Sequence, residues 1–273
     1  MASTDVDEFG IRRIYPTDIN PERSQAWLLG IGDWEARAPG WEGRRSKPDG
    51  FLQLKVTKDD GQIRYNVQSI PNASSVTEKD QRKLRSRGFM GTSKDWKNVE
   101  MTMYARINKA EGDRNGGKHF ELLARGGSNH TDSKPCEGTA LHTNLYVTGR
   151  VKLEKELSHT KGYTEDDPSI DNVTTNLMHR WIGMKGIFYN KSNGNVKIEL
   201  WLDKDANNVW GDNPILEYED RGNWRIQNNR NNECGGDKNE KITWGGPVVI
   251  FRWDNLTDVD IKYASVREII SPA

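Results

Sequence analysis

The stretch Val196-Lys-Ile-Glu-Leu-Trp-Leu-Asp203 decides the fold class, because apolar and polar side chains alternate along its whole length. Strand side chains point in turn to the two faces of a sheet, so this pattern predicts a β-strand with one dry face. Residues 118–125 and 139–147 alternate in the same way. We therefore expect three strands, each with one face turned away from an apolar core.

The polar faces of these strands carry reactive and aromatic groups. They include His119, Glu121, Arg125, His142, Asn144, Tyr146, Glu199 and Trp201. A sheet with one dry face and one such face is suited to a polar ligand. Sugar chains are the obvious ligand class, because their hydroxyls need hydrogen-bond partners and their ring faces pack on aromatic side chains.

Strand-like alternation extends over most of the chain. Further strands are predicted at residues 25–29, 51–57, 62–67, 98–107, 181–189, 247–253 and 259–269, with a turn at 58–61 and one helix at 75–86. Neither an internal repeat nor a linker divides the chain. We predict one domain, residues 1–273, folded as an all-β antiparallel two-sheet sandwich of the jelly-roll type, with residues 1–24 as a less ordered N-terminal arm.

The charge balance argues against two classes of partner. The 273 residues contain 40 basic and 40 acidic side chains, for a formal net charge of +0. Nucleic acids and anionic membranes usually select a basic excess, so neither is the expected main partner. No window approaches the roughly 20 apolar residues of a membrane span, so membrane insertion is not expected.

The two cysteines, Cys136 and Cys234, both occur in polar loops that contain glycine. Free structural cysteines are usually buried in apolar surroundings, so these positions favour a disulfide and an oxidising compartment. We therefore expect a secreted or cell-surface protein. No apolar signal-peptide core follows Met1, so either the chain begins after a removed signal or the protein is cytoplasmic, and both alternatives stay open.

Tryptophan is abundant, and several of the ten tryptophans stand in polar surroundings: Trp34, Trp41, Trp96, Trp210 and Trp224. A tryptophan in a polar loop either stacks on a sugar ring or closes one end of a sandwich with its N–H satisfied locally. Taking each tryptophan alone, the second interpretation is favoured. For the whole set, we expect one or two at a ligand site.

The types of residue needed for β-elimination on a uronate occur together in Arg125, His142 and Tyr189. One group must neutralise the carboxylate so that the C5 proton becomes acidic. A base then removes that proton, and an acid protonates the leaving oxygen. The alternative is that His142 and Tyr146 are ordinary outward residues of a half-exposed strand.

A metal site is one of two interpretations of the loop that begins Asp203-Lys-Asp205-Ala-Asn207. Oxygen ligands at alternate positions suit Ca²⁺, which would have a structural role here. Asp and Asn are also the usual residues of turns. No cofactor is required by the chemistry proposed above.

The last predicted strand, Val259-Asp-Ile-Lys-Tyr-Ala-Ser-Val-Arg-Glu-Ile-Ile270, closes a chain that resembles the concanavalin A-like jelly-roll superfamily. Its alginate-lyase branch uses an Arg-x-Glu-x-Arg strand, a Gln-x-His strand and a Lys-Ala-Gly-x-Tyr-x-Gln strand. The order here is similar: His119-Phe-Glu121-Leu-Leu-Ala-Arg125, then Ala140-Leu-His142, then Lys185-Gly-Ile-Phe-Tyr189-Asn-Lys191. His119 and Leu123 stand where the branch has arginines, and Ala140 and Lys191 where it has glutamines.

This resemblance implies His142 as base, Tyr189 as acid or base, and Arg125 at the substrate carboxylate. The residues expected to bind substrate are His119, Glu121, Asn144, Tyr146, Lys185 and Trp201. A retaining hydrolase of the laminarinase type would need a Glu-x-Asp-x-Glu strand, which the sequence lacks. We therefore predict a lyase acting on an acidic, uronate-containing polysaccharide. A non-catalytic carbohydrate-binding module and an extracellular structural protein are the alternatives.

Overall fold

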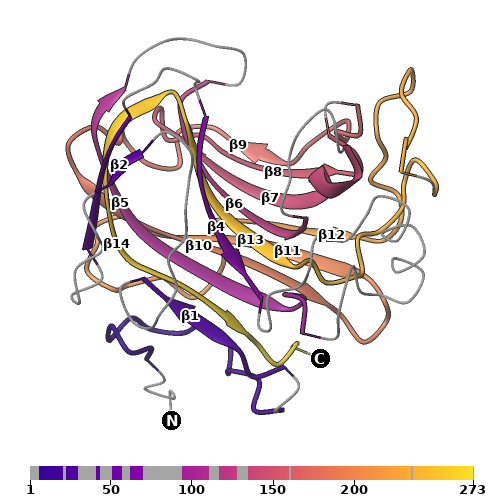
Figure 1. Cartoon of the computed structure of the whole chain (residues 1–273), viewed down its shortest axis with the longest axis horizontal. Coiled ribbons are helices and arrows are strands. Elements are labelled where there is room, and N and C mark those ends of the chain that lie inside the picture. The colour runs from indigo at the N-terminus through magenta and orange to yellow at the C-terminus, as the bar shows by residue number, and fades with distance from the viewer. Residues whose placement is uncertain are drawn as a thin grey trace.

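The computed structural model describes residues 6–20, 23–29, 41–43, 51–56, 62–69, 94–110, 117–127, 135–159, 161–234 and 236–272. These residues form two antiparallel β-sheets stacked face to face, with one short 3-10 helix, η1 (Pro135–Gly138) (Figure 1). The predicted all-β two-sheet sandwich is confirmed. The helix predicted at 75–86, the turn at 58–61 and Trp34 lie outside the described residues.

The eight-stranded sheet forms the lower layer in Figure 1. In spatial order its strands are β12 (Leu216–Asp220), β11 (Val196–Asp203), β10 (Trp181–Asn190), β5 (Val99–Ala110), β14 (Leu256–Glu268), β3 (Phe51–Val56) and β2 (Trp41–Gly43). β1 (Ala26–Leu28) pairs with the last part of β14, from Ser265 to Arg267.

The six-stranded sheet forms the upper layer. Its order is β4 (Gln62–Gln68), β13 (Val248–Asp254), β6 (His119–Gly126), β7 (Ala140–Tyr146), β8 (Val151–Glu156) and β9 (Ser169–Ile170). β13 lies beside β6, so strands that are distant in the sequence are neighbours in this sheet. This pairing places residues near positions 121 and 252 side by side.

The core lies between the two sheets and takes alternate residues from strands such as β5 and β6. Met101 and Met103 of β5 belong to the same apolar cluster as Phe120 and Leu122 of β6. The sheets approach closely at Gly186, where an added Cβ would lie 2.8 Å from the Thr143 hydroxyl oxygen. Period-two alternation thus fixes which side chains face the core and which point outward.

β8 is not predicted by the sequence analysis, although Val151 and Leu153 alternate with outward polar residues. Lys155 occupies the next inward position, where an apolar residue is expected. Its ammonium group lies 2.7 Å from the carboxylate of Asp220, and both side chains are fully buried. A buried ion pair thus replaces an apolar contact and disguises the strand.

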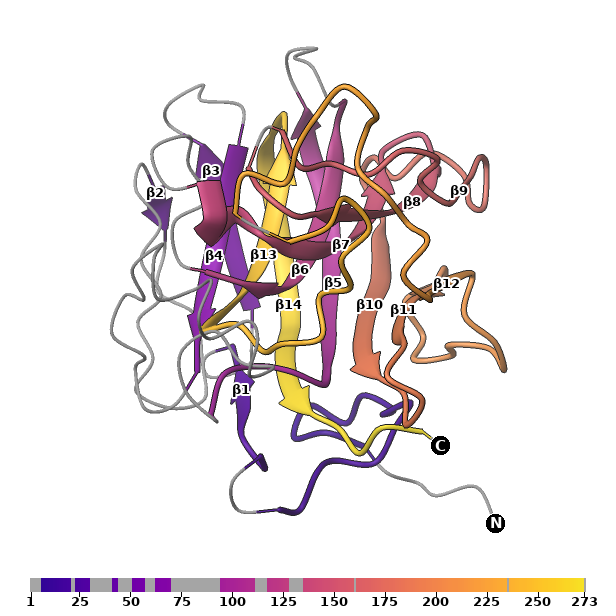
Figure 2. The same ribbon diagram turned by 90° about the vertical axis from the view of Figure 1, so that its right-hand side faces the viewer.

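Residues 6–20, part of the arm expected at 1–24, lie against the outward face of the eight-stranded sheet (Figures 1 and 2). A β-bridge joins Thr17 to Ile269, and Ile11 packs into a second apolar cluster on that face. The part of this face around Tyr189 and Trp201 is therefore covered by the chain's own N-terminal segment.

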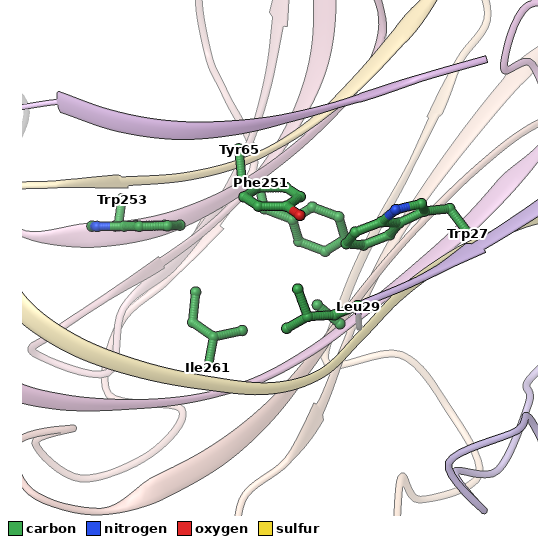
Figure 3. A pocket seen from close by; sticks show the side chains of 7 residues that line it. Trp27, Leu29, Tyr65, Phe251, Trp253 and Ile261 are labelled. Carbon is green, nitrogen blue, oxygen red and sulfur yellow. The ribbon is translucent and has the colours of Figure 1, made fainter. Parts of the chain in front are cut away.

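One small cavity of about 10 Å³ lies between the sheets. Its lining consists of Trp27, Leu29, Tyr65, Phe251, Trp253, Ile261 and Ala264 (Figure 3). A space of this size holds one water molecule at most. The cavity belongs to the core.

Candidate functional site

The predicted site residues do not share one surface. His142 lies on β7 of the six-stranded sheet, whereas Tyr189 lies on β10 of the eight-stranded sheet. Each alternates with core residues of its own strand, Leu141 and Phe188, and so points away from the core. The expected joint face of His142 and Tyr189 is thus corrected: the core of the sandwich separates them.

Tyr189 and Trp201 lie beneath the N-terminal arm. The hydroxyl groups of Tyr189 and Tyr15, and the indole N–H of Trp201, all donate to the carboxylate of Glu199 at 2.9 Å. The Tyr15 ring comes from the arm and meets the Tyr189 ring edge-on, with centroids 5.6 Å apart. The arm therefore fills the place that a ligand of Trp201 would need.

Lys185 is also enclosed on this covered face. Its ammonium group donates to Glu100 at 2.9 Å and to the Thr102 hydroxyl at 2.8 Å. Glu100 also accepts from Arg267 at 2.6 Å and from the backbone N–H of Tyr15. Burial opposes ionisation of Glu100, yet Lys185 and Arg267 hold its pKa below the usual value.

Arg125 occupies a structural position at the end of β6. Its backbone has φ of 68°, and its side chain is fully buried. The guanidinium donates to the carbonyl of Lys97 at 3.0 Å, to the side-chain oxygen of Asn190 at 2.6 Å and to the carbonyl of Ile242. Burial lowers the pKa of Arg125 to about 9. Arg125 thus ties strand ends together and does not lie with His142.

Five of the predicted residues do share the outward face of the six-stranded sheet: His119, Glu121, His142, Asn144 and Tyr146. The ring of His119 packs on that of Tyr146, with centroids 4.9 Å apart. The amide of Asn144 donates to Glu154 at 2.6 Å. These five predicted site residues of β6 and β7 thus lie together, whereas those of β10 and β11 lie on the other sheet.

His142 is the centre of this face. Its Nδ1 lies 2.5 Å from Glu121, and its Nε2 lies 3.4 Å from Glu156. Burial disfavours the imidazolium, but Glu121 and Glu156 raise the pKa of His142 to about 10. Burial likewise opposes ionisation of Glu121, yet Arg252 and His142 hold the pKa of that carboxyl well below its ordinary value.

Arg252, from the neighbouring strand β13, supplies a fixed cation. Its Nε lies 3.2 Å from Glu121, and Nε and Nη2 bind the two oxygens of Asp254 at 2.9 and 2.7 Å. Within the described part of the chain, the remaining nitrogen, Nη1, has no hydrogen-bond partner. Nη1 can therefore donate to a ligand.

Tyr163 completes the cluster from the loop after β8, where a β-bridge joins it to Glu156. Its ring centroid lies 6.1 Å from that of His142. Burial, and then the charges of Glu156 and Glu121, raise the pKa of Tyr163 well above its ordinary value. No described residue hydrogen-bonds its hydroxyl group, which distinguishes it from Tyr189.

Sequence reasoning missed Glu156, Arg252 and Tyr163. Glu156 ends β8, whose alternation is disguised by the inward Lys155, and Arg252 stands on an outward position of a predicted strand. Tyr163 lies outside the named strands, so no periodicity could indicate it. We define the His142 cluster as Glu121, His142, Glu156, Tyr163 and Arg252.

The loop after β11 has the hydrogen bonds of a turn. Asp203 accepts from the Tyr104 hydroxyl at 2.7 Å and from the backbone N–H groups of Asn207 and Asn208 at 3.1 and 2.6 Å. Asp205 is exposed. Among the described residues, no group of three or more His, Cys, Asp or Glu side chains could hold a metal ion. The contacts match the turn alternative.

Three of the tryptophans with polar sequence neighbours are buried, as the interpretation favoured for each tryptophan alone expects. Trp96, Trp210 and Trp224 are each at most 3% exposed, and the side chain of Trp41 lies outside the description. The predicted disulfide is present: Cys136 and Cys234 are bonded across a sequence separation of 98, with Cα atoms 5.3 Å apart. None of the described helices is long and apolar enough to cross a membrane.

The sequence matches no protein-family model and no curated protein significantly. Solved structures do resemble the fold. The exoplasmic/lumenal domain of VIP36 in its Ca²⁺-bound form is 11% identical, with a TM-score of 0.45 over 92% of this chain and 94% of that one. The endo-β-1,4-glucuronan lyase of the fungus Trichoderma reesei is 9% identical, with a TM-score of 0.42 over 90% and 95%.

Winged bean acidic lectin, complexed with methyl-α-D-galactose, is 9% identical, with a TM-score of 0.41 over 92% of this chain and all of that one. A lectin and a polysaccharide lyase are thus among these structures, and the superfamily that the sequence resembles includes both classes. At these identities and TM-scores the likeness concerns the fold, and function must be argued from the residues of the site.

Proposed function

We propose that the protein is a polysaccharide lyase that cleaves a uronate-containing polymer at the outward face of the six-stranded sheet. The observation that supports this function is the meeting of an imidazole, a phenol and a guanidinium in the His142 cluster. These three groups match the base, the acid and the carboxylate neutraliser that β-elimination requires. The cluster points away from the core, toward the side from which a polymer would approach.

The roles are assigned by position. Arg252 takes the place predicted for Arg125 and faces the uronate carboxylate through Nη1. Neutral His142 removes the C5 proton, and the hydroxyl of Tyr163 gives its proton to O4 as the C4–O4 bond breaks. A C4–C5 double bond remains, and the proton on His142 then returns to the phenolate of Tyr163.

This assignment implies an alkaline enzyme. With a pKa of about 10 for His142, only about 1% of the imidazole is neutral at pH 8. The pKa of Tyr163 is raised well above its usual value, so the acid keeps its proton while the base loses one. The rate should therefore rise about tenfold per pH unit between pH 7 and 9.

Non-catalytic carbohydrate binding is the second candidate, and one observation favours it. His142 and Glu156 are both fully buried, with the ring of Tyr163 near the imidazole. In this alternative, the only role of the charge cluster is to hold Tyr163, Tyr146 and the neighbouring polar side chains in place for a sugar chain. Binding without turnover would then be the whole activity.

The ultraviolet absorbance of unsaturated uronate separates these functions. The protein would be mixed at pH 7.5 and 9.5 with alginate, glucuronan, pectate, ulvan and hyaluronan. Rising absorbance that is faster at pH 9.5, and that disappears in Tyr163→Phe but not in Tyr189→Phe, is the expected result. A flat trace with every polymer would reject the lyase, and calorimetric binding of one polymer would then favour the second candidate.

A further inference from the structure

A second group of cations and aromatic rings lies on the outward face of the eight-stranded sheet. Lys262 of β14 places its ammonium 4.4 Å from the ring centroid of Trp181, 5.2 Å from Tyr263 and 5.9 Å from Tyr104. Arg106 of β5 lies over the same Trp181 ring at 5.1 Å. We call Arg106, Trp181 and Lys262 the Lys262 patch; all three are partly exposed.

The charges of this patch are not balanced within it. Arg106 binds Asp260 through Nε and Nη2, at 2.9 and 2.5 Å. Lys262 has no carboxylate within 4.0 Å among the described residues. Asp203 acts on it only from a distance, and its oxygens already accept hydrogen bonds from Tyr104 and from backbone N–H groups.

The consequence is repulsion between two neighbouring cations. Burial, and then the positive charge of Arg106, lower the pKa of Lys262. An anionic group between the ammonium and the guanidinium would relieve this repulsion, whereas a neutral or cationic ligand would not. Trp181 adds a ring surface beside the two cations, which suits an anion that is carried on a sugar.

We propose that the Lys262 patch is a second binding site, on the opposite side of the sandwich from the His142 cluster, for the carboxylate or sulfate group of an acidic polysaccharide. Lys262 and Arg106 hold the anion, and Trp181 packs against the sugar that carries it. Neither the lyase activity nor the His142 cluster is needed for this site.

A matched set of dextrans tests the proposal without supplying a lyase substrate. Affinity electrophoresis would compare dextran, carboxymethyl-dextran and dextran sulfate for the wild type, Lys262→Gln and Arg106→Gln. Lys161→Gln is the control, because Lys161 is 63% exposed, pairs with Glu233 and carries the same charge. Melting temperatures would establish that each variant is folded.

The wild type should be retarded by one or both charged dextrans and not by dextran, and added salt should weaken the effect. Which charged dextran binds identifies the anion as carboxylate or sulfate. Lys262→Gln should bind about tenfold more weakly, with Lys161→Gln within about twofold of the wild type. Equal binding of neutral dextran, no binding of either charged dextran, or equal losses in the two lysine variants would overturn the proposal.

The same experiment with Tyr163→Phe keeps this proposal apart from the lyase. That variant should bind the charged dextrans like the wild type, since Tyr163 lies on the other face. Loss of dextran binding in Tyr163→Phe would place the anion site at the His142 cluster and overturn the second site.

Discussion

His142 shows how one residue's chemistry depends on neighbours that are remote in sequence. Glu121 comes from the adjacent strand β6 and Glu156 from β8 on the other side, so the imidazole has a carboxylate near each ring nitrogen. A histidine buried alone would lose its charge. Here the two carboxylates reverse that tendency, and the residue is a cation at neutral pH.

This shift makes stability depend on pH in a defined direction. The folded pKa of about 10 exceeds the ordinary histidine pKa of 6.5. The contribution of His142 is therefore complete below about pH 6.5 and is lost as the pH rises through about 10. Urea unfolding at pH 6, 8 and 10 should show a large stability gap between the wild type and His142→Gln at pH 6, shrinking toward pH 10.

His179→Asn is the control for that series, because His179 is exposed and asparagine tolerates its φ of 62°. Its stability difference from the wild type gives the reference for replacing an exposed histidine. A gap for His142→Gln that does not change between pH 6 and 10 would contradict the assigned charge state.

Tyr163 and Tyr189 are predicted to respond in opposite ways to loss of the hydroxyl. Tyr189 donates to the charged Glu199, so Tyr189→Phe should cost about 1–2 kcal/mol of unfolding free energy and leave turnover unchanged. Tyr163 makes no such bond to a described residue, so Tyr163→Phe should stay within about 0.5 kcal/mol of the wild type and lose turnover. Chemical unfolding and the uronate assay on both variants check this, and the reverse pattern would exchange their roles.

At the scale of elements, the N-terminal arm decides which sheet face is available. It supplies the Tyr15 hydroxyl to Glu199, backbone N–H groups of Ile14 and Tyr15 to Glu100, and the side chain of Ile11 to an apolar cluster. Without the arm, the buried charges of the eight-stranded sheet would face solvent with part of their hydrogen bonds missing. The arm is therefore part of the folded structure of this sheet.

Deletion of residues 1–18 should lower the free energy of unfolding by at least about 3 kcal/mol, because it removes a buried apolar side chain and several hydrogen bonds to charged groups. Binding of a hydrophobic dye should increase at the same time. Tyr15→Phe, which removes one hydroxyl, should cost only about 1 kcal/mol. If the deletion variant unfolds at the same urea concentration as the wild type, the arm contributes nothing to stability.

At the scale of the whole molecule, the Cys136–Cys234 disulfide links η1, which precedes β7, to the long segment between β12 and β13. The crosslink closes a loop of roughly one hundred residues, so it should strongly reduce the conformational entropy of the unfolded chain. Replacing both cysteines by serine should lower the unfolding free energy by about 2–5 kcal/mol. The urea midpoint of that variant should agree with the midpoint of the wild type in reductant. If both midpoints equal that of the oxidised wild type, the argument for an oxidising compartment is lost.

The sequence predicted the elements better than their arrangement. Strands β5, β6, β7, β10, β11, β13 and β14 follow from alternation, which depends only on adjacent residues. β8 was missed because Lys155 is buried through an ion pair, which no local pattern reveals. Arg125 was predicted to bind the substrate carboxylate. It has a positive φ and donates to a backbone carbonyl instead, and a local pattern reveals neither feature.

What the sequence by itself determined is the set of alternating strands, the all-β class, the reactive character of the outward faces and the cysteine pair. Only the tertiary structure decided that His142 and Tyr189 lie on opposite sides of the core, and that Glu156, Tyr163 and Arg252 surround His142. The physical reason is that alternation specifies which face of its own strand a side chain occupies. The sheet that the strand joins, and the neighbours it meets there, depend on contacts between distant parts of the chain.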